Sequence, residues 1–152
     1  MAQTLTLNQV VDTITQIATA HKQIKSVYFG DIADYLSKGT DNIYPSLYYD
    51  VTGANIQGKS LTLNFSLYFF DRMLAENTNE TEVLSDMLEV AQDILAQLKY
   101  NNFIFDEMTS ATISFITEDT PDLLAGVKVD MALDIPFLAD RCQVPTTYTY
   151  PQ

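Results

Sequence analysis

The sequence has no tryptophan, one cysteine and one histidine. A single cysteine cannot form a disulfide within the chain, so the cysteine content gives no sign of an oxidising compartment. Zinc sites need several converging His or Cys side chains, which His21 and Cys142 alone do not supply. The five glycines are scattered, and no glycine-rich phosphate loop is present. The sequence therefore predicts no metal and no cofactor.

Basic residues are also scarce, with eight Lys and Arg against twenty Asp and Glu and a net charge of -12. Phosphates and anionic membranes are both held by clustered Lys and Arg, so we expect neither specific nucleic-acid binding nor membrane docking. The simpler explanation of the acidic net charge is solubility. The more specific explanation is a surface that lets a polyanion pass without binding it. No apolar run is long enough for a membrane span or a signal peptide, which favours synthesis in a cytoplasm and use there or inside something assembled there.

The possible nucleophiles, Ser85 and Cys142, lack the neighbouring residues that would activate them for catalysis. Ser85, followed by Asp86, falls inside a predicted helix without a Gly-x-Ser-x-Gly elbow. Cys142 has no neighbouring histidine, and His21 falls at a predicted helix end, where a capping or surface role is simplest. The carboxylates form no EF-hand or buried acid–base pair. We expect no enzymatic activity.

Two helices are predicted by capping boxes followed by apolar stripes of helical period. Thr6 and Gln9 open the first helix, with His21, Lys22 and Lys25 at its end. Asn79 and Glu82 open the second. The expected apolar face of the second helix, and of the core, comprises Val83, Leu84, Met87, Leu88, Val90, Ala91, Ile94, Leu95 and Leu98.

Five segments read as strands. The clearest is 61–70, where alternation places Leu61, Leu63 and Phe65 on one face and polar residues on the other. The other segments are 27–29, 44–51, 103–116 (bent around Asp106 and Glu107) and 126–137. Turns are expected at Gly53, Asn55 and Gly58, and at the acidic run 118–122.

These elements predict an α+β domain with a mainly antiparallel sheet and two helices on one face, in the order α-β-β-β-α-β-β. Residues 1–140 form the expected single domain and residues 141–152 an extended C-terminal tail. The tail, rich in Pro, Thr and Tyr, is either a disordered end or an arm laid along a neighbour's sheet edge.

Several segments carry more aromatic area than a water-exposed surface requires, which indicates a subunit interface. The alternative is that helices or loops of the same domain cover them. The candidate interface residues are Tyr44, Tyr48, Tyr49, Tyr68, Phe70, Tyr148 and Tyr150.

Four segments together resemble tail-terminator and tail-completion proteins of tailed bacteriophages, a group whose folds recur in neck and ring proteins. These segments are Ile43-Tyr44-Pro45-Ser46-Leu47, Leu67-Tyr68-Phe69-Phe70-Asp71, the helix from Asn79 to Met87, and Gly126-Val127-Lys128-Val129-Asp130-Met131. The resemblance covers roughly residues 5–140 in element order, and it leaves the tail without a counterpart.

The resemblance implies a structural virion protein, assembled in the bacterial host cytoplasm. Such proteins form a homo-oligomeric ring, a hexamer or dodecamer, at the head–tail junction or on the tail tube. Expected partners are portal, neck or tail proteins, with DNA passing through the bore without specific binding. An acidic lumen or loop would use Asp31, Asp34, Glu118, Asp119 and Asp122. The alternative function is a non-viral α+β module that binds a small ligand or peptide on the aromatic sheet face.

Overall fold

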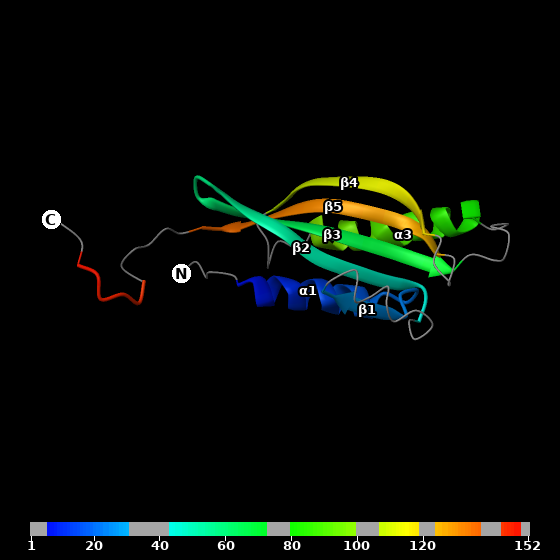
Figure 1. The fold of residues 1–152 in the computed structure, drawn as a ribbon, viewed down its shortest axis with the longest axis horizontal. Helices are drawn as coiled ribbons and strands as arrows, with labels where there is room; N and C mark the ends of the chain where they lie inside the picture. The colour runs from blue at the N-terminus through cyan, green and yellow to red at the C-terminus, as the bar shows by residue number, and fades with distance from the viewer. Residues whose placement is uncertain are drawn as a thin grey trace.

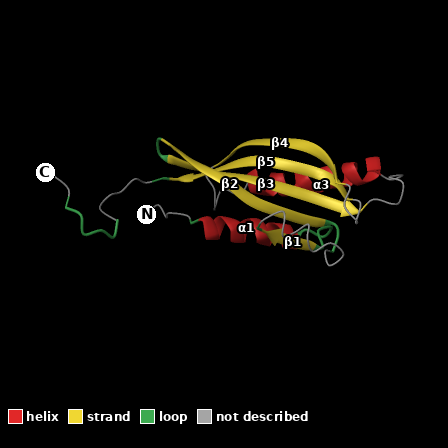
Figure 2. Ribbon diagram, in the orientation of Figure 1, coloured by secondary structure: helices red, strands yellow, loops and turns green. Residues whose placement is uncertain are grey.

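The protein folds into one five-stranded sheet and two helices, in the computed structural model described here for residues 6–30, 43–72, 80–99, 107–118, 124–137 and 144–149. The sheet order is β1-β2-β3-β5-β4, and only the β1–β2 pair is parallel. Figures 1 and 2 show the arrangement. The predicted α+β class and element order are confirmed. The elements are α1 (Leu7–Ala20), β1 (Ser26–Phe29), β2 (Ser46–Gln57), β3 (Ser60–Arg72), α3 (Glu80–Lys99), β4 (Glu107–Glu118) and β5 (Leu124–Pro136).

Helix α1 begins at the predicted capping box. The Thr6 amide donates to Gln9 Oε1 at 2.9 Å, and the Gln9 amide donates to Thr6 Oγ1 at 3.2 Å. The helix ends at Ala20 with His21 as its C-cap, so the three basic residues follow the last helical turn instead of lying in it. Val10, Ile14 and Ala18 form its buried stripe, as the 3.6-residue period requires.

Helix α3 begins at Glu80, and the predicted cap residue Asn79 lies outside the described residues. Glu80 and Glu82 in its first turn and Lys99 in its last complement the helix dipole. The predicted apolar face is confirmed: seven of its nine residues are buried, and Leu84 and Leu88 are partly buried against the same core.

Both helices cover the same face of the sheet. The inward residues of β3 are buried with Val127, Val129 and Leu133 of β5 and with the apolar stripes of α1 and α3. The alternation predicted over 61–70 therefore holds, with only Leu61 less than fully buried. Each large apolar side chain in this layer stabilises the fold by ~1.5–3 kcal/mol before chain entropy is subtracted.

Strand β2 runs further than predicted. The turns expected at Gly53 and Asn55 are wrong, because both residues lie in the strand and only Gly58, with φ of 57°, lies in a turn. A register shift between Val51 and Gly53 leaves one extra residue on β2. Such a bulge bends and twists a strand without ending it, so the glycine does not mark a turn. The result is a long β2–β3 hairpin.

Strand β4 also departs from its predicted bounds. Its irregularity is a register shift between Met108 and Ser110, slightly beyond the predicted bend. Glu118 is the last residue of β4 and pairs with Leu124, so it does not belong to a turn. The rest of the predicted acidic turn lies outside the described residues.

Gly126 allows β3 and β5 to approach each other closely. It pairs with Phe70 on one side and Ile116 on the other. A Cβ placed on Gly126 would overlap the backbone carbonyl oxygen of Phe69 and lie 3.1 Å from the Phe70 Cα. Backbone atoms in the middle of a sheet cannot yield as a flexible side chain can, so this position requires glycine.

We predict that Gly126→Ala lowers the free energy of unfolding by about 1–3 kcal/mol, the range for overpacking a well-packed interior. Urea denaturation followed by circular dichroism measures the loss. Gly53→Ala is the matched control, because a Cβ there meets nothing within 4 Å. Equal stability of the two variants would contradict the close approach.

Tyr49 joins the sheet to α1 through hydrogen bonds. It is fully buried beneath the helix, and its hydroxyl donates to the Val11 carbonyl oxygen at 2.9 Å. The same hydroxyl lies 2.5 Å from Thr15 Oγ1. Burial raises the pKa of the Tyr49 hydroxyl, the Thr15 hydrogen bond lowers it, and the Asp12 carboxylate raises it again, with a net rise. The neutral phenol is the form that the folded chain holds.

We predict that Tyr49→Phe changes how stability depends on alkaline pH. Because the folded pKa is raised, the Tyr49 contribution is fully present below about pH 10, the ordinary tyrosine value, and is lost as pH rises through the folded pKa. At neutral pH the variant should lose about 1 kcal/mol, a typical net value for a hydrogen bond. Urea unfolding from pH 7 to 11 should show a smaller alkaline loss in the variant. Parallel curves for variant and wild type would contradict this account.

Candidate assembly surfaces

Strand β4 forms one edge of the sheet. It is paired with β5 along its length, and no described strand lies on its other side. Phe115 projects from the helix-bearing face of β4 and is 58% exposed. Its neighbours Ser114 and Thr112 are exposed too. This edge combines unpaired backbone with a large apolar side chain, which is unfavourable for an isolated monomer.

The opposite side of the sheet presents a second and different edge. Strand β1 covers only Ser46–Tyr49 of β2, and no other described strand pairs with the outer side of β2. The outer half, Thr52–Gln57, is exposed throughout and belongs to the hairpin that projects beyond the helices (Figure 1). We call these six residues the hairpin edge. It contains no charged residue and no proline, the usual devices that protect an edge.

The sheet face away from the helices is aromatic at one end. Neighbouring strands bring Tyr28 within 5.8 Å of Tyr48, and Tyr48 within 5.4 Å of Tyr68, measured between ring centroids. Tyr68 stacks on Phe70 at 6.0 Å. The Lys128 ammonium lies 5.7 Å from the Tyr68 ring centre, on the rim of this cluster. The aromatic rings thus pack against one another across β1, β2 and β3.

The structure divides the predicted interface residues. Tyr48 is 1% exposed, and Tyr49 and Phe70 are fully buried, so these three have no side-chain area for a partner. Tyr49 even faces the helices, because adjacent strand residues point to opposite faces. Tyr44 and Tyr68 are half-buried and Tyr148 is 62% exposed, whereas Tyr150 lies outside the described residues. The period of two was the signal that could have separated Tyr48 from Tyr49.

The other end of the same face is polar and acidic. Thr62 Oγ1 donates to Asp134 Oδ1 at 2.6 Å, and Ser66 Oγ donates to Asp130 Oδ1 at 2.7 Å. Asp50 stands opposite Ser66 on the other neighbouring strand. Two hydroxyls of β3 therefore bind two carboxylates of β5, and Asp50 adds a third carboxylate on β2. Lys128, with its ammonium 3.8 Å from Asp130 Oδ1, offsets part of this negative charge.

The acids predicted for a lumen mostly cannot be placed. Asp31, Asp34, Asp119 and Asp122 lie outside the described residues, and of Glu118 only the backbone is described. Asp130 and Asp134 lie on the face away from the helices, and the sequence alone predicts no role for them. Their register opposite Ser66 and Thr62 could be found only once the strands were paired.

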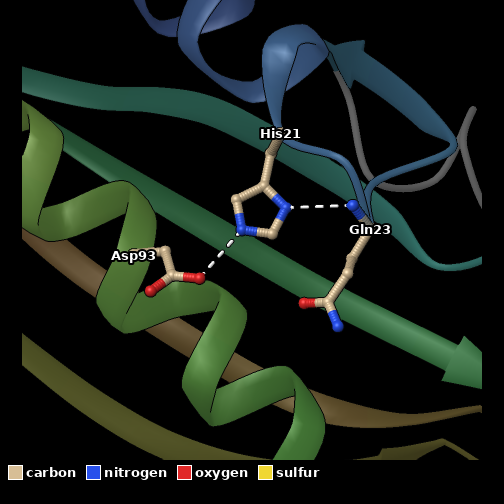
Figure 3. A network of polar contacts seen from close by, with 3 residues as sticks. All are labelled: His21, Gln23 and Asp93. Carbon is tan, nitrogen blue, oxygen red and sulfur yellow. Dashed lines mark hydrogen bonds and ion pairs between the residues drawn. The ribbon is translucent and has the colours of Figure 1, made fainter.

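Of the residues considered for catalysis, the structure describes Ser85, Asp86 and His21, and no hydrogen bond or ion pair joins His21 to either of the others. Ser85 and Asp86 are exposed on α3, and Cys142 lies outside the described residues. His21 Nε2 lies 2.9 Å from Asp93 Oδ2, while its Nδ1 accepts from the Gln23 amide at 3.1 Å (Figure 3). Acceptance at Nδ1 places the proton on Nε2, so the imidazole ties the end of α1 to α3. Within the described residues, no three His, Cys, Asp or Glu side chains group as metal ligands.

A cavity of about 280 Å³ lies where the loop after α1 meets β3 and α3. Lys22, Lys25, Asp71 and Asp86 line it with both signs of charge. Burial raises the pKa of Asp71, the Arg72 amide lowers it, Asp86 raises it and the Arg72 charge lowers it, with a net rise. Because the lining carries both signs of charge and its lysines are exposed, the cavity does not indicate a particular class of ligand.

No protein-family model and no curated protein sequence matches the chain. Among the described helices, neither is both long and apolar enough to cross a bilayer.

We predict that Asp71→Asn stabilises the fold more at neutral than at acidic pH. Because the folded pKa of Asp71 is raised, its favourable contribution is present below its ordinary pKa and is lost as pH rises through the folded pKa. Asn keeps an oxygen for the Arg72 amide, which now donates to Asp71 Oδ1 at 2.8 Å. Thermal melts at pH 3.5 and pH 7 measure the difference. A variant that is less stable at pH 7 than the wild type would contradict the shift.

Proposed function

We propose that this chain is a structural protein of a tailed-bacteriophage virion that forms a ring at the head–tail junction or on the tail tube. The observation that carries the proposal is the pair of unlike open edges, β4 on one side of the sheet and the hairpin edge on the other. A closed cyclic ring is built from heterologous contacts, which need two different surfaces on each subunit. The resemblance in sequence segments supplies the biological setting.

Size supports a ring and not a single enclosing subunit. A compact domain of 152 residues has a radius of gyration of ~15 Å, so one copy cannot surround a DNA duplex. Several copies can do so when each contacts its neighbours at its β4 edge and at its hairpin edge, and the resemblance implies six or twelve copies. Portal, neck or tail proteins would stack on the two ends of such a ring.

The charge distribution supports passage of DNA through the bore. If neighbours join at the sheet edges, one face of each sheet turns toward the axis. The open face carries Asp50, Asp130 and Asp134, which outnumber Lys128 beside Asp130. The outer surface of α3 carries exposed Glu82, Glu89 and Asp93. A bore lined by either face therefore repels phosphates, and DNA moves without being held.

The alternative function, a module that binds a ligand or peptide, requires the aromatic sheet face to form the pocket. Tyr48 and Phe70 on that face are 1% and 0% exposed. A ligand would have to displace packed rings to reach them. We therefore favour assembly, without enzymatic activity, over small-ligand binding.

We predict that the purified protein forms a closed ring of fixed copy number, measured by mass photometry. Phe115→Asp should abolish the ring, because it places a carboxylate on the exposed apolar side chain of the β4 edge. Circular dichroism should show an intact monomer, because Phe115 lies outside the buried core.

Gln97→Asp is the matched control, since it adds the same charge at an exposed position of α3. It should leave the ring unchanged. A protein that stays monomeric at every concentration and joins no neck or tail protein would refute the proposed function.

A further inference from the structure

We propose that the C-terminal segment Val144–Thr149 of one copy adds as a strand to the hairpin edge of the next copy. The inference deepens the proposed ring and rests on it. Both surfaces are exposed along their whole length, so within one chain they do not cover each other. Figure 1 shows the segment, in red, lying apart from the sheet.

The two surfaces match in length and composition. Each has six residues without a charge, in a chain where 18% of residues are charged. Copies of a chain with net charge -12 repel each other, so neutral segments are the places where backbones can approach. Val, Thr and Tyr make up five of the six residues of the C-terminal segment, and these side chains favour strands.

The proline in the segment fixes which side would face the hairpin. Pro145 has no amide hydrogen, so in an added strand its nitrogen must face solvent. Alternation then turns the amides of Val144, Thr146 and Tyr148 toward the hairpin edge. Two of these amides now donate locally, Thr146 to the Val144 carbonyl oxygen at 2.9 Å and Tyr148 to Thr146 Oγ1 at 3.0 Å. Such turn-type bonds can be exchanged for ladder bonds.

The segment starts from the hairpin end of the sheet. Strand β5 ends beside the hairpin turn, where the Phe137 amide donates to the Lys59 carbonyl oxygen at 2.7 Å. The seven steps from Phe137 to Val144 span at most ~25 Å, so the segment begins near the hairpin end of the sheet. Each copy then gives one arm and receives one arm, and this contact can close around a ring.

The first test is cross-linking between two chains. In a Cys142→Ser background, a size-tagged chain carries Asn55→Cys on the hairpin edge and an untagged chain carries Thr147→Cys. Ala54→Cys and Ile56→Cys scan the register, because a disulfide forms only when Cα atoms lie within about 7 Å. After mixing and oxidation, we expect a tagged–untagged covalent dimer on a non-reducing gel. Gln97→Cys on α3 is the matched control and should give none.

The outcomes separate this inference from the proposed ring. A ring without any cross-link at the three hairpin positions would overturn the inference and leave the ring intact. A separate chain carries both Asn55→Cys and Thr147→Cys. If cross-links form only within this chain and never between the two mixed chains, exchange between copies is overturned. Absence of both the ring and the cross-link would overturn the proposed function as well.

The second test removes residues 144–152. The ring should then dissociate at a concentration at least about tenfold higher, since a loss of ~1.4 kcal/mol already changes an equilibrium tenfold. The thermal melt of the monomer should not change, because the described part of the segment is exposed. A truncated chain that unfolds would place the segment in the core and overturn the inference.

Discussion

The pairing of β3 on both sides is the constraint on which the rest of the structure depends. This strand is in register with β2 and with β5 along almost its whole length. Its alternation assigns Leu63, Phe65 and Leu67 to the helix-bearing face, and a shift by one residue would turn them to the other face. The positions of α1 and α3 follow, because their apolar stripes have only this surface to cover. The close backbone approach at Gly126 belongs to the same ladder.

Much of this could be predicted from local sequence. The capping box at Thr6, the apolar stripes and the strict alternation in β3 are each set by side chains within a few residues of one another. The β2 bulge could not be predicted, because the register of β2 depends on β3 as its partner. Gly53 reads as a turn residue when the partner strand is unknown. The same reason explains why the rows joining Thr62 to Asp134 and Ser66 to Asp130 emerged only with the paired sheet.

The candidate surfaces also combine features that local sequence predicts with features that depend on strand pairing. The aromatic residues indicate either a subunit interface or burial within the domain, and the sequence does not divide them between the two. Period-two geometry separates Tyr48 from Tyr49, and packing between strands then buries Tyr48 and Phe70. The exposed features that remain, Phe115 and the hairpin edge, have no motif in the sequence. Their exposure depends on where the sheet stops, which is a property of the whole topology.

An acidic chain that assembles must separate its repulsive surfaces from its adhesive ones. The strands provide this separation, because side chains project from the two faces while the backbone is offered at the edges. Here the carboxylates Asp50, Asp130 and Asp134 lie on a face, and the hairpin edge is neutral. Attraction between copies can then come from backbone hydrogen bonds and Phe115. In the proposed ring, repulsion acts along the sheet normals, toward the bore and the outside, where it opposes binding of DNA and of unrelated acidic proteins.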